Sequence, residues 1–403
     1  MCERQEDDIT KLLGLQGWKA EKVEVGEKEV LVYLDRIKEA TCPRCGGMSH
    51  SLYAQGKAKK VLHHWITGRR IYVKVRRRRF WCKACQGPFP EEIPWLRPWA
   101  RMTRQAEGEA LYELRHLSFS QVQAKLGVSY GTLRRILDRG IDEEEVLECL
   151  NDWDELFLGI DGHSFRHQEM VNSVSEVKHH RLLTILPNDR KQTLKDFLRK
   201  LPVEKIREVC IDMNEGLRRA VQEVLPKVKL VVDPFHVIAD ANRRVDEARR
   251  IEQEALRRKR VTIPKKIFLV GNERLSDQKR ERVKGLLIKY PSLQGFYWAK
   301  EKLRELYRQG DRNEAAKLLD NIIFNLKSSD DGELIRWGNT LRRWKEPILN
   351  HFENQTTNGF TEGCNTKIKM LKRISYGLRN VDVYAKKLLL AFLPPTTIYY
   401  HEI

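Results

Sequence analysis

Three acidic side chains each follow an apolar run of the sequence, and a fourth lies far downstream in a basic stretch. In chain order these residues are Asp161, Asp212, Asp233 and Glu362. Short apolar runs are typical of buried strands, so the first three carboxylates are expected at strand ends. Carboxylate oxygens are the ligands that hard divalent cations prefer, and paired cations serve phosphoryl transfer. The acids therefore predict a two-metal site that acts on nucleic acid.

The fourth acid requires a helix that packs against the strands. Spacing of i, i+4 and i+7 gives this helix a buried stripe of Cys364, Ile368 and Leu371. A second stripe carries Glu362, Asn365, Lys369 and Lys372. An acid followed by cations along one face suits a metal followed by a DNA backbone. A single Asp after a strand can equally be a turn former or a helix cap, and that reading stays open for each acid.

Two C-x-x-C pairs indicate a second metal. Four cysteines make up these pairs: Cys42, Cys45, Cys82 and Cys85. Two residues between thiols allow both sulfurs to reach one ion, and two such pairs are typical of a structural tetrahedral zinc. Because four thiolates fill the coordination sphere, no catalysis is expected there.

Between the two cysteine pairs, four consecutive arginines favour contact with phosphates. These are Arg76, Arg77, Arg78 and Arg79. On a strand they would place cations on both faces. The alternative is a solvated hairpin.

Residues 101–150 have the spacing of a helix-turn-helix. Gly127 separates two helical segments, and Ser129 is suited to cap the second. The second helix of such a motif reads the major groove from its N-terminal end. The side chains expected to face DNA are Ser129, Tyr130, Thr132 and Arg134. A plain helical hairpin is the alternative.

The charge balance favours a polyanionic partner. The chain of 403 residues carries a formal charge of +19, and its sequence pI is about 9.5. We therefore expect double-stranded DNA as partner. The sequence has no apolar run long enough to span a membrane and begins with an acidic segment that lacks a signal-peptide core, so we expect a cytoplasmic protein with reduced thiols.

The pattern of expected elements gives a multidomain α/β protein. Residues 1–100 are expected to form a zinc-binding, DNA-binding module, followed by the helix-turn-helix at 101–150. The remainder, 151–403, alternates strands and helices. It contains a charged helical insertion at about 240–350.

These residues resemble the ISL-three-type family of bacterial insertion-sequence transposases, which are DDE transposases with an RNase H-like catalytic fold. The resemblance rests on both cysteine pairs and on several short segments along nearly the whole chain. These are Phe157–Asp161, Ile211–Met213, Val232–Val237, Asn358–Asn365, Lys367–Lys369, Leu371–Arg373 and Tyr376–Gly377. Two features depart from the pattern: Gly162 stands where many relatives carry another acid, and 168–180 matches a hairpin poorly.

The resemblance implies that Asp161, Asp212 and Glu362 bind Mg²⁺ or Mn²⁺. It implies a zinc ribbon-like N-terminal module and an RNase H-like mixed sheet with helices. Asp233 and His236 match an Asp-x-x-His signature, which we assign a supporting role. Asp233 as the second metal ligand remains the rival assignment.

The implied activity is cutting at element ends and joining of the 3′-hydroxyl to target DNA. Lys369 and Arg373 are expected to contact DNA beside Glu362. Because two element ends must be brought together, a homo-oligomer is expected. The implied location is the nucleoid of a bacterial cell. Two alternatives remain. A transcription regulator with a zinc ribbon and helix-turn-helix would account only for residues 1–150. A nuclease on the same fold would cut without joining.

Overall fold

The computed structural model describes residues 8–15, 17–36, 39–166, 169–256 and 262–393. The chain forms two compact units, one made of Met1–Asp142 with Met370–Ile403 and the other of Glu143–Lys369. The C-terminal residues therefore cluster with the N-terminal unit, whereas the sequence pattern grouped them with the acids. Among the described residues, no helix combines the length and apolar character that a membrane span requires.

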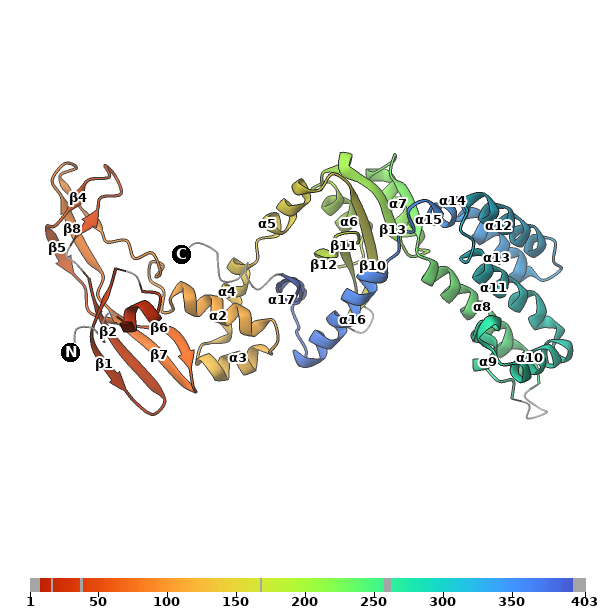
Figure 1. Ribbon diagram of the computed structural model, residues 1–403, viewed down its shortest axis with the longest axis horizontal. Coiled ribbons are helices and arrows are strands. Elements are labelled where there is room, and N and C mark those ends of the chain that lie inside the picture. Colours follow the sequence, from red (N-terminus) through yellow and green to blue (C-terminus); the bar gives the residue numbers. More distant parts are fainter. Residues whose placement is uncertain (1–7, 16, 37–38, 167–168, 257–261, 394–403) are drawn as a thin grey trace. The chain divides into compact units, whose positions relative to one another are not determined.

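Three small sheets open the first unit (Figure 1). The largest has the order β1-β2-β7-β6, and its strands are β1 (Lys19–Val25), β2 (Glu29–Asp35), β7 (Arg69–Val75) and β6 (Lys59–Ile66). A second sheet pairs β5 (Leu52–Gln55), β8 (Arg78–Cys82) and β9 (Gly87–Pro90). The third joins β3 (Ala40–Thr41) to β4 (Met48–Ser49). The two smaller sheets carry the cysteine pairs.

Helices α2 (Arg104–Leu114), α3 (Phe119–Leu126), α4 (Tyr130–Gly140) and α17 (Val381–Phe392) follow these sheets or pack beside them in the first unit. Ser118 and Gln121 form a capping box at the start of α3, and Gly127 ends that helix with a φ of 70°. The C-terminal α17 packs against α2 and α4, where the buried ammonium group of Lys387 donates to the carbonyl of Leu117. The helix-turn-helix is thus supported by a helix from the far end of the chain.

A five-stranded sheet forms the centre of the second unit, in the order β12-β11-β10-β13-β14. Its strands are β10 (Leu156–Arg166), β11 (Glu169–Glu176), β12 (Arg181–Leu186), β13 (Ile206–Ile211) and β14 (Lys229–Val232). The first three strands are antiparallel, and β13 and β14 run parallel to β10. The segment that matched a hairpin poorly in sequence contains β11, which pairs with both β10 and β12.

The two faces of this sheet differ because successive strand side chains point to opposite sides. On one face, Leu158, Ile160, Val209 and Ile211 form a buried core with α6 (Lys191–Leu198) and α7 (Glu215–Val224). The opposite face carries small and polar residues, among them Gly159, Ser173 and Ser175. A polar face at the centre of a buried sheet needs hydrogen-bonding partners.

Those partners come from α16 (Gly359–Ile374) and the residue just before it. The Asn358 amide donates to the Ile160 carbonyl at 3.1 Å, and the hydroxyls of Thr361 and Ser175 lie 2.6 Å apart. Asn365 continues the same stripe one turn later and lies 2.8 Å from the Ser173 hydroxyl. These hydrogen bonds fix the position of the helix on the sheet.

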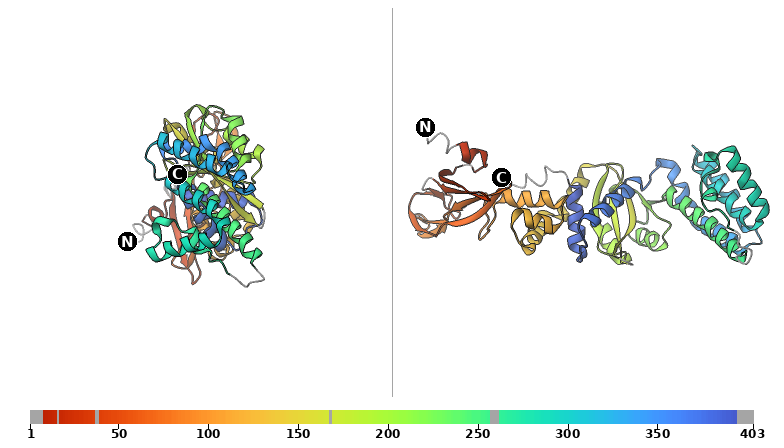
Figure 2. Two further views of the ribbon diagram at one scale, coloured as in Figure 1. Left: turned by 90° about the vertical axis from the view of Figure 1, so that its right-hand side faces the viewer. Right: turned by 90° about the horizontal axis from the view of Figure 1, so that it is seen from below.

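A helical insertion separates β14 from α16. It begins with α8 (Pro234–Ala255) and continues through α9 (Lys266–Leu269), α10 (Asp277–Lys289), α11 (Gln294–Leu306), α12 (Arg312–Lys327), α13 (Gly332–Arg343), α14 (Lys345–Leu349) and α15 (His351–Asn354). Helix α11 packs on both α8 and α12, and α12 packs on α13 (Figure 2). Glu208 on β13 then accepts hydrogen bonds from Asn354 and Thr356, which fasten the end of the insertion to the sheet.

Gly159 allows the close approach of α16 to the sheet. A Cβ there would lie 2.4 Å from the Thr361 hydroxyl and 2.6 Å from the Asn358 carboxamide oxygen. We predict that Gly159→Ala lowers stability by about 1–3 kcal/mol, because overpacking displaces α16. Gly162→Ala on the same strand is the control, since its Cβ would meet nothing closer than 3.3 Å. Thermal unfolding of both variants makes the comparison, and equal melting temperatures would contradict this account of the helix.

Candidate active site and nucleic-acid interface

Four carboxylates from distant parts of the chain surround one histidine. Nε2 of His236 lies 2.7 Å from Oδ1 of Asp212 and 3.8 Å from Oε1 of Glu362. It lies 3.9 Å from Oδ2 of Asp233 and 4.0 Å from Oδ1 of Asp161. The structure therefore brings together all five acidic-site residues that the sequence singled out.

Each of these side chains has a defined origin in the fold. Asp212 directly follows β13, and Asp233 is the N-cap residue of α8. His236 and Glu362 lie in the first turns of α8 and α16. Asp161 does not end its strand as expected, because β10 continues to Arg166 by pairing with β11. Because β10 and β13 are adjacent and parallel, with Ile160 opposite Ile211, Asp161 and Asp212 lie side by side.

Asn365 is a site residue that sequence reasoning left without a role. Its amide donates to Oδ2 of Asp161 at 2.6 Å, while its carbonyl oxygen accepts from the Ser173 hydroxyl at 2.8 Å. Ser173 also lies 3.2 Å from the Asp161 carbonyl. One oxygen of Asp161 is thus held in place, which leaves Oδ1 to face His236. The sequence signals for Asn365 are its place in the polar stripe three residues after Glu362 and in the segment Asn358–Asn365 that resembles the family.

Several polar atoms at the centre of the cluster are buried, and apart from the short approach of Asp212 to His236 they have no hydrogen-bond partner. Among the described residues they include Oδ1 of Asp212, Oδ2 of Asp233, Oε1 of Glu362 and Nε2 of His236. Orphaned buried polar atoms are rare and costly, so their convergence at one point calls for a partner. Two overlapping sets each fit one metal ion: Asp161, Asp212 and His236, and Asp233, His236 and Glu362. The donor atoms are those that divalent cations bind.

The electrostatics of the cluster favour an added positive charge. Burial and the neighbouring Asp212 carboxylate raise the pKa of Asp161. Burial and the carboxylate of Asp233 raise the pKa of Glu362 in the same way. Burial alone would lower the pKa of His236, but the surrounding carboxylates raise it above its ordinary value. The cluster thus gathers four carboxylates around a single histidine.

The four paired cysteines also converge. Sγ of Cys42 lies 4.0 Å from Sγ of Cys85, and Sγ of Cys45 lies 3.5 Å from Sγ of Cys82. All four sulfurs lie within 4.8 Å of one another. Zinc–sulfur bonds of about 2.3 Å in a tetrahedron place sulfurs about 3.8 Å apart, so this geometry fits one zinc ion.

The arginine run divides into exposed and internal side chains. Arg76 and Arg79 are exposed. Arg78 is only 3% exposed and pairs with Asp35, and Arg77 donates to the carbonyl of Arg97. Arg78 was therefore wrongly placed among the DNA contacts, because the run does not continue as one strand. Strand β7 ends at Val75, and the chain turns before β8.

The helix-turn-helix presents the expected residues at the start of α4. Ser129 uses its hydroxyl to cap the helix through the Thr132 amide, and Tyr130 is 43% exposed. Arg134 is exposed and lies 3.8 Å from Asp138. On α16, Lys369 and Arg373 are also exposed. These side chains are accessible to a polyanion.

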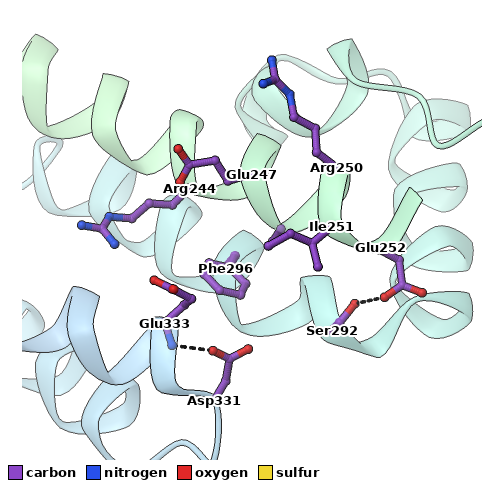
Figure 3. A pocket seen from close by; sticks show the side chains of 10 residues that line it. Arg244, Glu247, Arg250, Ile251, Glu252, Ser292, Phe296, Asp331 and Glu333 are labelled. Atoms are coloured by element: carbon purple, nitrogen blue, oxygen red, sulfur yellow. Dashed lines mark hydrogen bonds between the residues drawn. The ribbon is translucent and has the colours of Figure 1, made fainter. Parts of the chain in front are cut away.

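A separate cavity of about 400 Å³ lies in the helical insertion (Figure 3). Ile251 and Phe296 line its centre, and charged side chains surround them. Most of these charges already have protein partners, as in the hydrogen bond from Ser292 to Glu252. None of the clustered carboxylates lines this cavity. The acidic cluster is therefore the stronger candidate for chemistry.

Comparisons with known proteins find similarity to transposases. The family model DDE_Tnp_ISL3, described as a transposase, matches residues 158–388. A second model, the helix-turn-helix domain of transposase family ISL3, matches residues 91–141 and confirms the predicted motif. The strand transfer complex of the Drosophila P element transposase aligns with 75% of this chain and 94% of that chain, at 13% identity and a TM-score of 0.37.

Curated relatives align over almost the full length. The transposase for insertion sequence element IS1001 of Bordetella parapertussis is 25% identical over 394 residues, covering 94% of this chain and 96% of the relative. The transposase for element IS1557 of Mycobacterium tuberculosis is 24% identical, with 89% and 88% coverage. With a transposase model matching more than half of its residues, this chain belongs to the ISL3 family of insertion-sequence transposases.

Proposed function

We propose that this transposase cuts the ends of its element and joins the 3′-hydroxyl to target DNA at the carboxylate cluster. The convergence of Asp161, Asp212, Asp233 and Glu362 on His236 is the observation that carries this proposal. The strand order supports an RNase H-like fold, with three antiparallel strands followed by two parallel ones. Asp161 lies on the central strand β10, and Asp212 and Asp233 follow the parallel strands β13 and β14. Glu362 lies on α16, the helix that packs on this sheet.

In this proposal Asp161, Asp212 and Glu362 hold two Mg²⁺ or Mn²⁺ ions. Such ions, when bound, activate a water or 3′-hydroxyl and stabilise the leaving oxygen. Asn365 orients the Asp161 carboxylate, and α16 presents Glu362 from the opposite side. The exposed cations that follow on α16, Lys369 and Arg373, hold the DNA backbone beside the site.

Asp233 and His236 take supporting roles. The side chain of Asp212 is 27% exposed, whereas that of Asp233 is 4% exposed. Burial raises the pKa of Asp233, while His236 and the backbone N–H of Asn358 oppose that rise. Asp233 thus connects the start of α8 to the start of α16, and His236 lies between the ligands.

The first unit supplies DNA recognition in this proposal. A zinc ribbon-like module at residues 1–100 exposes Arg76 and Arg79 to phosphates, and the helix-turn-helix presents Tyr130 and Arg134 to base edges. Thr132 and Ser129 fix the start of the reading helix. Double-stranded DNA is the partner, and pairing of two ends requires a homo-oligomer.

Removal of the Glu362 carboxylate tests the reaction. We predict that Glu362→Gln lowers cleavage and strand transfer at least about 10³-fold, because a divalent ion loses a charged ligand. Binding to end DNA should remain within about twofold of wild type, since Gln keeps the size and shape of the Glu362 side chain. Glu333→Gln, which changes an exposed side chain at the start of α13 in the insertion, is the control. Cleavage at wild-type rate by Glu362→Gln would refute the proposal; cutting without joining would favour the nuclease alternative.

Two isosteric variants separate the candidates for second metal ligand. We predict that Asp212→Asn abolishes binding of the Mn²⁺ ion that Asp212 holds. Asp233→Asn should weaken Mn²⁺ binding about 10- to 100-fold, as expected for a residue that acts through a ligand. Isothermal titration with Mn²⁺ measures both. The reverse order of effects would show that Asp233 is the ligand and Asp212 the support.

Metal analysis tests the cysteine cluster. We predict one zinc per wild-type chain and none in Cys82→Ser, because three thiolates leave the tetrahedron incomplete. DNA-end binding should fall in parallel as the module unfolds. Cys149→Ser is the control, since this cysteine belongs to neither C-x-x-C pair and donates its thiol hydrogen to the carbonyl of Val146. Full zinc content in the Cys82 variant would contradict a four-cysteine site.

A further inference from the structure

An exposed aromatic ring lies beside His236 of the acidic cluster and has no role in the proposed metal binding. Phe235 is 60% exposed, although full burial of a Phe side chain is worth about 1.5–3 kcal/mol. It lies between Pro234 and His236 in the first turn of α8. Its ring meets the His236 ring edge-on, with centroids 5.4 Å apart. The ring therefore borders the site where a phosphate would react.

The backbone beneath this ring is rigid. Asp233 is 3% exposed and follows directly after buried β14, and Pro234 fixes φ at the first helical position. The ring is thus attached to the same turn that positions Asp233 and His236. A side chain on this turn presents an apolar ring beside His236 to whatever occupies the site.

The substrate of such a site offers one apolar surface, the face of a base. In a duplex that face is covered by its neighbours, so a protein ring can reach it only if the base leaves the stack, at a cost of a few kcal/mol. Stacking on an aromatic side chain returns about 1–3 kcal/mol per base. In one nucleotide, the base and the phosphate are separated only by the sugar, so the two lie close together. A base next to the scissile phosphate is therefore within reach of Phe235.

We propose that Phe235 is a stacking platform that holds one unpaired base beside the scissile phosphate. This inference rests on the proposed function, because it assumes that the carboxylate cluster cuts DNA. Phe235 acts as a positioning residue: by holding the base out of the duplex, it bends the strand and directs the phosphate toward Asp161 and Glu362.

The test uses the full-length protein and duplexes of the element's own end. 2-Aminopurine replaces each base near the cleavage position in turn, and its fluorescence rises when it leaves the stack. Without divalent metal, wild-type protein should raise the signal several-fold at one position. Phe235→Ala should leave that base paired and dark. Phe235→Trp should extrude the base but quench it by direct contact.

Cleavage rates provide the second readout. We predict that Phe235→Ala slows cleavage of paired DNA about 5- to 100-fold, the equivalent of one lost stacking contact. A mismatch at the identified position should restore the rate to within about threefold of wild type, because the substrate is already open. Phe324→Ala is the matched control, an equally large ring that is 70% exposed on α12 of the insertion.

The outcomes separate this inference from the proposed function. Failure of a mismatch to rescue Phe235→Ala, or a wild-type fluorescence pattern in that variant, overturns the stacking role even if the acids cut DNA. If Glu362→Gln cuts normally while the fluorescence still depends on Phe235, the proposed chemistry fails and base capture stands. Equal loss in Phe235→Ala and Phe324→Ala would show a general effect of exposed rings and also overturn the proposal.

Discussion

The polar contact between α16 and the central sheet is the constraint on which the rest of the site depends. Asn358, Thr361 and Asn365 follow one stripe of the helix and bind the backbone or side chains of β10 and β11. Glu362 lies beside this stripe, so its place relative to Asp161 is set by these hydrogen bonds. Gly159 leaves the space that the contact needs. An apolar interface would tolerate sliding, whereas buried hydrogen bonds fix the register of the helix.

The cluster itself opposes folding. Four carboxylates meet one histidine, and several of their atoms are buried without hydrogen bonds. Desolvation and mutual repulsion raise the pKa of three of these acids, Asp161, Asp233 and Glu362. A chain selected only for stability would replace some of them. The apolar core on the other face of the sheet, formed with α6 and α7, supports this unfavourable arrangement. Divalent cations are the partners that would relieve it.

The sequence predicted the parts of the site that depend on local pattern. Apolar runs predicted the strands that precede Asp212 and Asp233, and paired cysteines predicted the four-sulfur cluster. Long-range contacts were harder to foresee. Asn365 reads as an ordinary polar helix residue until Asp161, on a strand far away in sequence, is placed beside it. Arg78 reads as a surface cation, but Asp35 and the turn before β8 bury it. The grouping of α17 with the helix-turn-helix has no local signal at all, because only tertiary packing shows it.

Manganese offers the most direct test of a single metal cage made from distant acids. Crystals of the protein bound to Mn²⁺ would be measured for anomalous scattering. The account predicts two peaks about 3.5–4 Å apart, bounded by Asp161, Asp212 and Glu362, as in other two-metal sites. No peak among these carboxylates at saturating Mn²⁺, or a Glu362 side chain directed away from the metal, would contradict it.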